Sequence, residues 1–270
     1  ILSEMSVRKT PFGVILAEAQ SKGYAEADPT FDVEGIDASQ KLAILASLSF
    51  GIPLSVSEFF VEGITSILLE DVSFAKELGF TIKHIGICRE INGRLEARVH
   101  PALIPDSSLL AHVNGVSNAV MVNSDAVDTT LFYGPGAGSK ATASSVIADI
   151  IDVAKSRESA CFSSLGYPID RLKRKDIMNI EDIECGFYIR FVALDKAGVL
   201  SEITTIMANA SVSIESIIQR DHVSKIDHVN VVIITSKIKH STLDPVVKKI
   251  KKLENVVDEI VLIRVEHLDQ

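Results

Sequence analysis

Along the first 80 residues, apolar side chains recur at the three- and four-residue spacing that is typical of amphipathic helices. Pro11 suits a first helical turn and Gly23 a C-terminal stop, which bounds the first of these helices. An acidic connector, residues 26–34, separates it from the second, and its Asp28-Pro29 step favours a turn. We predict four helices, over residues 11–21, 36–50, 56–69 and 71–78.

The hydrophobic pattern then changes to the two-residue alternation of strands. Asn92-Gly93 lies between two alternating runs, and this dipeptide is the strongest short hairpin signal in a sequence. The pattern predicts strands over residues 82–90, 94–103, 118–123 and 127–133, a glycine-rich loop at 134–138 and a helix over 141–155. The first half is therefore predicted to be α+β, with helices and a mixed, largely antiparallel sheet.

The second half follows a charged and weakly periodic stretch, residues 156–183, which we interpret as a linker. Beyond it the pattern predicts, in order, strand 187–194, helix 199–210, strand 212–219, strand 228–235, helix 243–252 and strand 256–265. This βαββαβ order is the ferredoxin-like arrangement. We predict a first domain over residues 1–155 and a second domain over residues 184–270.

Composition and charge exclude several classes of function. The formal net charge is −9 without a basic cluster, which argues against nucleic acid or an anionic membrane surface as partner. A hydrophobic share of 47% excludes disorder as the main state, and no apolar run reaches the roughly 18 residues of a membrane span. Three cysteines, Cys88, Cys161 and Cys185, suit a reducing compartment, so we expect a cytoplasmic protein.

The start of the chain carries a further expectation. Ile1 is not a translation start, and the first residues lack the basic and apolar regions of a signal peptide. We therefore expect that the chain begins inside a longer polypeptide and that a part of it lies upstream.

Asp37 and Lys41 are the first candidates for chemistry, because their i, i+4 spacing puts both on one helix face. An exposed pair of this kind stabilises a helix by only about 0.3 kcal/mol, and a plain surface ion pair is one reading. The stripe continues through Ile44 and Leu48, however, so we expect the pair to lie on a buried apolar face. Burial would favour the neutral form of Lys41, and the carboxylate of Asp37 would favour its charged form. The balance between these two effects tunes the pKa of a proton donor.

The acidic connector is the second candidate. It puts five carboxylates within twelve residues, namely Glu26, Asp28, Asp32, Glu34 and Asp37. A solvated loop is one interpretation, and a site that receives a substrate ammonium group is the other, since carboxylates bind amines through charge-assisted hydrogen bonds. The seven histidines show no ligand spacing, so we expect no metal site.

Two glycine-containing turns complete the set. Gly134-Pro-Gly-Ala-Gly138 lies between a strand and a helix, but Ser139 breaks the dinucleotide fingerprint, so a full Rossmann domain is not predicted. The loop remains either a plain turn or a close backbone approach to a ligand. Asp195-Lys-Ala-Gly198-Val199-Leu200 opens a helix of the second domain and is either a cap with a glycine turn or a seat for an amino-acid carboxylate.

These segments carry a family resemblance. The pattern Ala19-x3-Gly23-Tyr24-Ala25-x2-Asp28-Pro29-x2-Asp32-Val33-x-Gly35-x-Asp37-x3-Lys41 resembles the signature of homoserine dehydrogenases at every fixed position. The segment Asp128-Thr-Thr-Leu-Phe-Tyr-Gly-Pro-Gly-Ala-Gly-x3-Thr142-Ala143 resembles the same family's closing strand, glycine loop and returning helix. Residues from about 186 to 265 resemble an ACT domain, a small regulatory module.

The resemblance implies NAD(P)-dependent interconversion of L-homoserine and L-aspartate 4-semialdehyde, a step toward threonine, methionine and isoleucine. It implies that Lys41 donates or accepts the proton at the substrate oxygen, with Asp37 beside it. It makes Glu26 the residue that holds the substrate amino group, with Asp32 also at the substrate, and brings Gly138 close to the nicotinamide. The family's nucleotide-binding domain, which would bind most of the cofactor, lies upstream of this chain.

For the second domain we expect L-threonine as the effector, bound at Asp195, Gly198, Val199 and Leu200. We also expect a homodimer or homotetramer, because the strands of the first half leave an open edge or face to be covered. The alternative to the enzyme is a non-catalytic amino-acid-sensing protein that retains the substrate fold. The sequence does not distinguish NAD from NADP, because the residue that reads the ribose lies in the upstream part.

Overall fold

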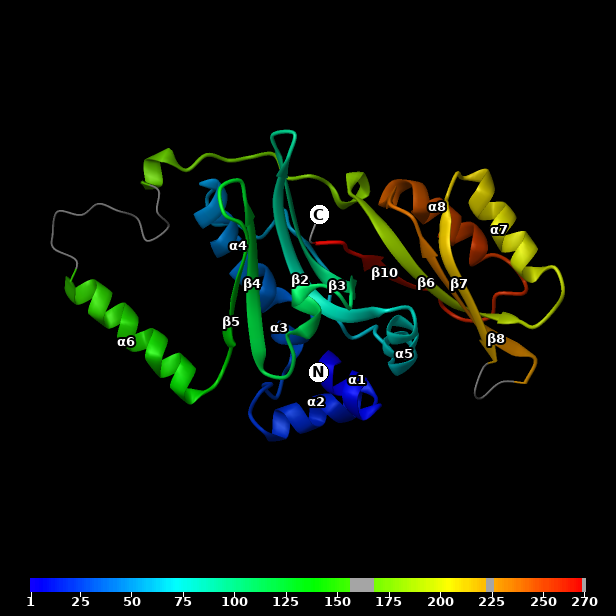
Figure 1. Ribbon diagram of the computed structural model, residues 1–270, viewed down its shortest axis with the longest axis horizontal. Helices are drawn as coiled ribbons and strands as arrows, with labels where there is room; N and C mark the ends of the chain where they lie inside the picture. The colour runs from blue at the N-terminus through cyan, green and yellow to red at the C-terminus, as the bar shows by residue number, and fades with distance from the viewer. Residues whose placement is uncertain (156–167, 222–225, 269–270) are drawn as a thin grey trace.

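The structure is a computed structural model that describes residues 1–155, 168–221 and 226–268 of the 270-residue chain. Part of the predicted linker, with Cys161, lies outside the described residues. Figure 1 shows an elongated molecule in which the first half of the chain occupies one end and the second half the other. Within the described ranges, we find no helix whose length and apolar character suit a membrane span.

Helices dominate the first 77 residues, as the sequence predicts. They are α1 (Leu2–Arg8), α2 (Phe12–Ser21), α3 (Thr30–Val33), α4 (Ile36–Phe50) and α5 (Leu69–Glu77). The prediction of a helix over residues 36–50 is confirmed to the residue, because Gly35 and Gly51 adopt the left-handed conformation at its two ends. Helices α1 and α3 were not predicted.

The predicted helix over residues 56–69 is wrong. This stretch is irregular and contains only the short strand β1 (Phe60–Val61) before α5 begins. Ile64 and Ile67 have helical spacing and are buried, but the backbone N–H of Ile64 donates to Val33 O at 2.9 Å instead of within a helix. Hydrogen bonds to distant segments replace the local ones, which a periodicity argument does not detect.

The predicted hairpin is confirmed. Strands β2 (Phe80–Ile91) and β3 (Arg94–Pro105) pair antiparallel over their full length. Asn92 and Gly93 both have positive φ, 52° and 81°, as a two-residue type I′ turn requires. A second hairpin, β4 (Ser117–Ser124) and β5 (Asp128–Pro135), forms a separate two-stranded sheet and leads into α6 (Ser139–Lys155). A 3-10 turn, Leu109–His112, precedes it.

The second half has the predicted βαββαβ order with one short extra strand. Its elements are β6 (Glu184–Leu194), α7 (Val199–Asn209), β7 (Ile214–Asp221), β8 (His228–Thr235), β9 (Ile238–Lys239), α8 (His240–Ile250) and β10 (Val261–Val265). The strand order β10-β6-β8-β7 has antiparallel neighbours throughout, so the ferredoxin-like arrangement is confirmed. Two 3-10 turns, Ile169–Arg171 and Ile180–Asp182, lie before it.

The two halves share one sheet. Strand β10 pairs antiparallel with β6 and parallel with β3, so the described strands form a continuous eight-stranded sheet from β1 to β7. Helices α7 and α8 cover one face of the second half, where Phe187, Ile189 and Phe191 are buried. Tyr188 and Val232 point to the opposite face and pack in the core to which α1, α2 and α5 contribute. The second half is thus built onto the first through both backbone and side chains.

Candidate active site

Helix α4 carries the pair Asp37 and Lys41 on an exposed face. Lys41 Nζ donates to Asp37 Oδ2 at 2.5 Å, and the two side chains are 62% and 35% exposed. The expectation of a buried pair is therefore wrong. Ile44 and Leu48, on the same stripe, are also exposed, at 48% and 42%. The helix is apolar on more than one face, and the one it buries against the strands is the opposite face, with Leu42 among its residues.

The acidic connector is held by hydrogen bonds that leave its carboxylates outside. Thr30 donates to Asp28 Oδ1 from its hydroxyl at 2.6 Å and from its backbone N–H at 3.1 Å, which opens α3. The hydroxyl and then the backbone hydrogen bond hold the pKa of Asp28 below its usual value. Gln20 Nε2 donates to the carbonyl of Glu26 at 2.9 Å. The connector thus has a defined path, with the side chains of Glu26 and Asp32 at the surface.

The structure brings three carboxylates and the lysine onto neighbouring elements. Asp32 lies in α3, which packs against α4 with Asp37 and Lys41, and Glu26 lies four residues before α3. A strip of negative charge next to an ammonium group can bind a zwitterionic amino acid and exchange a proton with its side-chain oxygen.

The glycine loop after β5 is shaped by two different requirements. A Cβ on Gly136 would lie 1.6 Å from Asn118 Nδ2, so a side chain at this position requires the Asn118 side chain to move. Gly138 has a φ of +116° and nothing within 4 Å of its Cβ position, so its backbone is open on that side. Gly138 therefore fits either reading, a turn residue or a backbone that a ligand approaches.

The four candidate residues at the start of α7 line one cavity. It has a volume of about 190 Å³ and is lined by residues 193–200, Gln219, Val229 and Val231. Gly198, with a φ of +96°, opens the helix, and Gln219 Nε2 donates to Asp195 Oδ1 at 3.4 Å. The structure thus brings Asp195, Gly198, Val199 and Leu200 together around a space of amino-acid size.

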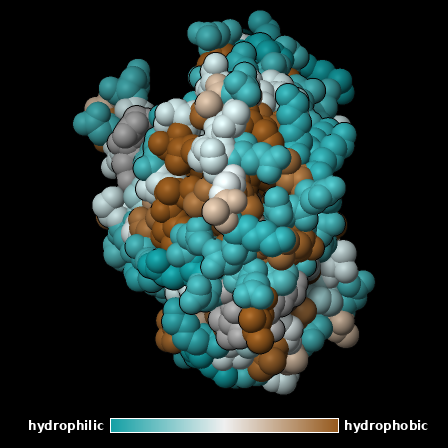
Figure 2. All heavy atoms as spheres, turned by 90° about the vertical axis from the view of Figure 1, so that its right-hand side faces the viewer, coloured by the Kyte–Doolittle hydropathy of each residue, from teal (hydrophilic) through white to brown (hydrophobic). Residues whose placement is uncertain are grey.

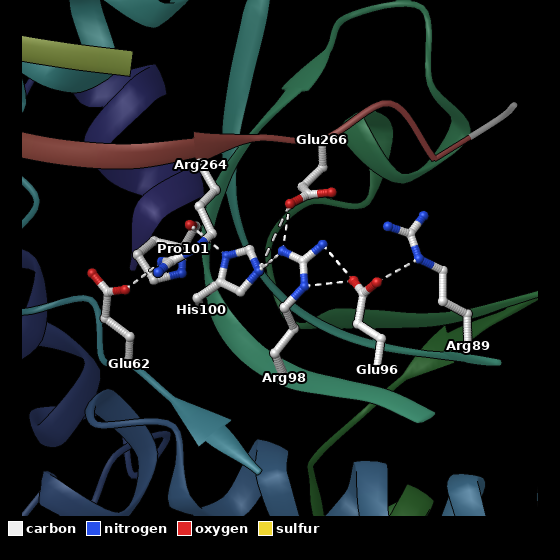
Figure 3. Close-up of polar contacts among 8 residues, drawn as sticks. All are labelled: Glu62, Arg89, Glu96, Arg98, His100, Pro101, Arg264 and Glu266. Atoms are coloured by element: carbon white, nitrogen blue, oxygen red, sulfur yellow. Dashed lines mark hydrogen bonds and ion pairs between the residues drawn. The ribbon is translucent and has the colours of Figure 1, made fainter. Parts of the chain in front are cut away.

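A buried charged cluster lies where β3 meets β10 (Figure 3). Arg98 donates to Glu96 Oε1 at 2.7 Å and to Glu266 Oε1 at 2.5 Å, and all three side chains are buried. Arg98 also donates to His100 Nε2, whose Nδ1 donates to Pro101 O at 2.9 Å. Burial and then the charge of Arg98 hold the pKa of His100 well below its usual value, consistent with a neutral ring that accepts from an arginine.

A second buried ion pair joins α5 to the second half. Asp71 accepts from Arg190 Nε at 2.5 Å and from the Tyr188 hydroxyl at 3.0 Å. The same carboxylate accepts from the Leu68 N–H at 2.9 Å and so caps α5. The sequence analysis singled out none of the residues of these two clusters. The Arg98–Glu266, Asp71–Tyr188 and Asp71–Arg190 contacts join residues 117 or more positions apart, so only the fold brings these residues together.

The comparisons with known proteins agree with this geometry. Residues 1–151 match the family model described as homoserine dehydrogenase. The chain belongs to the homoserine dehydrogenase family. Residues 187–255 match the ACT domain, as the resemblance of the second half implies.

Individual relatives match along almost the whole chain. The homoserine dehydrogenase of Pseudomonas aeruginosa is 45% identical over 272 residues, covering 100% of this chain and 63% of that protein. That of Bacillus subtilis is 38% identical, over 96% of this chain and 59% of its own length. The crystal structure of a homoserine dehydrogenase from Thiobacillus denitrificans has a TM-score of 0.88 at 40% identity, over 98% of this chain and 61% of that one. The chain spans about three fifths of the length of these relatives.

Proposed function

We propose that this chain provides the substrate-binding and effector-binding parts of an NAD(P)-dependent homoserine dehydrogenase, which interconverts L-homoserine and L-aspartate 4-semialdehyde. The observation that carries the proposal is that the acidic connector, with Glu26 and Asp32 exposed, leads through α3 to α4, where Lys41 and Asp37 form an exposed ion pair. Family membership supports it, because the relatives that match this chain are named for this activity.

The residues of the site have separate roles in substrate binding and proton transfer. Glu26 and Asp32 bind the substrate ammonium group and fix its orientation. On oxidation Lys41, as the neutral amine, takes the proton from the hydroxyl of L-homoserine. On reduction Lys41, as the ammonium group, donates a proton to the aldehyde oxygen, while Asp37 holds the lysine. The cofactor supplies hydride transfer, and the open backbone at Gly138 fits a position close to the nicotinamide. Most of the cofactor would be held by the part of the relatives that this chain does not span.

Glu26 provides the test of substrate binding. In the full-length protein, Glu26→Gln is expected to raise the KM for L-homoserine about tenfold or more, because it removes a charged partner of the ammonium group. The kcat should change much less, since the interaction exists before and during the reaction. Steady-state kinetics measures KM and kcat. The control is Glu259→Gln, which breaks an exposed ion pair with Lys251. A wild-type protein that binds an effector but never turns over L-homoserine would support the alternative of a non-catalytic sensor.

We propose L-threonine as the effector, bound in the cavity at Asp195–Leu200. The free N–H groups at the start of α7 would receive its carboxylate, since Gly198 opens the helix without a side-chain cap. In a calorimetric titration, Gly198→Ala is expected to weaken binding about tenfold or more, because alanine at this φ displaces donors to a charged group. Gly115→Ala, at another exposed glycine with positive φ, is the control and should bind normally. Equal affinity of the two variants would contradict the assignment.

We also propose that the protein is at least a dimer. Two-stranded sheets are marginal alone, and neither β4–β5 nor α6 has a buried residue. Phe132 and Tyr133 of β5 and Ile147 and Ile150 of α6 are exposed. Sedimentation at micromolar concentration should give at least twice the monomer mass, and Phe132→Asp should lower it. A wild-type monomer would contradict the proposal.

A further inference from the structure

Residues 60–65, which we name the bridging segment, join the central sheet to the acidic connector. On the sheet side, β1 pairs parallel with β3, and the N–H of Glu62 donates to Val99 O at 2.8 Å. On the connector side, the N–H of Ile64 donates to Val33 O at 2.9 Å and the hydroxyl of Thr65 to Glu34 Oε1 at 3.0 Å.

The contact between the bridging segment and the connector leaves no free space. A Cβ on Gly63 would lie 2.4 Å from Glu34 Oε2 and 2.7 Å from Val33 O. A Cβ on Gly35 would lie 2.9 Å from His84 Cε1, and Gly35 also needs its φ of +81° to open α4. Because close-packed atoms cannot absorb a shift, a movement of the bridging segment displaces the connector just before α4.

The second half of the chain holds the bridging segment through one arginine (Figure 3). Arg264, in β10, donates from Nη1 to Glu62 Oε2 at 2.7 Å and lies over the Phe60 ring, with Cζ 4.6 Å from its centroid. The Arg264 side chain is only 5% exposed, whereas that of Glu62 is 33% exposed. A buried guanidinium depends strongly on its carboxylate partner, so this pair fixes where Glu62 lies.

His84 fixes the backbone of the same residue. Its Nε2 lies 3.0 Å from Glu62 O, and a carbonyl only accepts, so Nε2 carries the proton. Burial lowers the pKa of His84, which keeps the ring neutral in this position. Side chain and backbone of Glu62 are therefore held independently, the first by Arg264 and the second by His84.

We propose that Glu62 is a positioning residue for the substrate site and that Arg264 sets its position from the second half of the chain. The proposal rests on the proposed function. The stretch Val33–Gly35 lies between Asp32 and Asp37, so a shift of the bridging segment changes the spacing of these two carboxylates. Lys41 and Asp37 lie on one rigid helix and move together, so the proton-transfer pair stays intact.

The test is Glu62→Gln in the full-length protein, which keeps the shape of the side chain but removes its charge. The KM for L-homoserine should rise about tenfold, while kcat should stay within about threefold, because sub-ångström misplacement of binding groups is costly. Glu77→Gln is the matched control. It breaks the exposed ion pair of α5 with Arg220 in β7, which also joins the two halves but does not touch the bridging segment. Its KM should be unchanged.

The outcomes are distinct. A wild-type protein that does not turn over L-homoserine contradicts the proposed function, but it does not contradict the positioning of the connector by Glu62 and Arg264. An active wild type with an unchanged KM for Glu62→Gln, or an equal rise for Glu77→Gln, overturns the positioning role. If thermal unfolding shows that Glu62→Gln does not fold, Arg264→Lys carries the test. It retains the charge without the guanidinium fork, and should raise KM about threefold with normal kcat; a normal KM for this variant overturns the proposal.

Discussion

Replacement of Lys41 by alanine in the full-length protein is expected to lower kcat by at least about 100-fold, with little change in cofactor affinity. Hydride transfer to the aldehyde leaves an alkoxide that must be protonated, and the reverse reaction must remove the hydroxyl proton. In the proposed function Lys41 exchanges this proton, and Asp37, whose Oδ2 lies 2.5 Å from Lys41 Nζ, orients it. Steady-state kinetics in both directions, with cofactor titrations, measures the two quantities.

Lys248 offers a matched control for Lys41. It also forms an i, i+4 ion pair of 2.5 Å, with Asp244 on α8, and its side chain is mostly exposed. Lys248→Ala should leave kcat unchanged, because α8 lies in the second half and not beside the acidic connector. A near-normal kcat for Lys41→Ala would return the pair to the reading of a surface ion pair.

The largest expected effect on stability belongs to Asp71. Asp71→Asn removes the closer charged partner of the buried Arg190 guanidinium, which keeps Glu70 at 3.6 Å, and it weakens the cap of α5. The expected cost is about 3–5 kcal/mol in the free energy of unfolding. Denaturant unfolding followed by circular dichroism measures the difference. The midpoint should fall without a large change in slope, since the surface exposed on unfolding stays nearly the same.

Asp244→Asn is the comparison for Asp71→Asn. Asp244 is also a carboxylate in an ion pair, with Lys248, but that pair lies at the surface. Its loss should leave the free energy of unfolding nearly unchanged, because exposed ion pairs contribute little to stability. Equal effects of the two substitutions would show that the buried pair contributes no more to stability than a surface one.

Local signals predicted a large part of this fold. Helix α4 was predicted to the residue because glycines end it on both sides, and the β2–β3 hairpin because Asn92-Gly93 imposes its turn. The structure of residues 56–69 was predicted wrongly, because their backbone forms hydrogen bonds with Val33 and Val99, which lie far away in the sequence. Apolar spacing reports which side chains are buried, and in this stretch it does not report which backbone partners they have.

In the candidate site, too, the features that are local in sequence were predicted and those that depend on tertiary contacts were not. The carboxylates of the acidic connector and the residues Asp37 and Lys41 lie close together in the sequence. The ion pair between Asp37 and Lys41 is present in the structure. The prediction that Lys41 is buried was wrong, because the sequence of a helix that is apolar on several faces does not reveal which face meets the sheet. Gly63 and His84 were missed because their role is steric and tertiary. The only local signal was a glycine within an apolar stretch, and a single glycine has many explanations.

The shared strand β10 has a consequence for how the protein is made. Residues 264 and 265 pair with residues 102 and 103, so this part of the β3 edge has no partner until residues 264 and 265 have been synthesised. Contacts of such long sequence separation slow folding, and an unpaired strand edge is prone to aggregate in the meantime. The second half of the chain is therefore needed to complete the sheet of the first half. A nascent chain that stops short of β10 has an incomplete sheet, and it is in this state that chaperones would meet it.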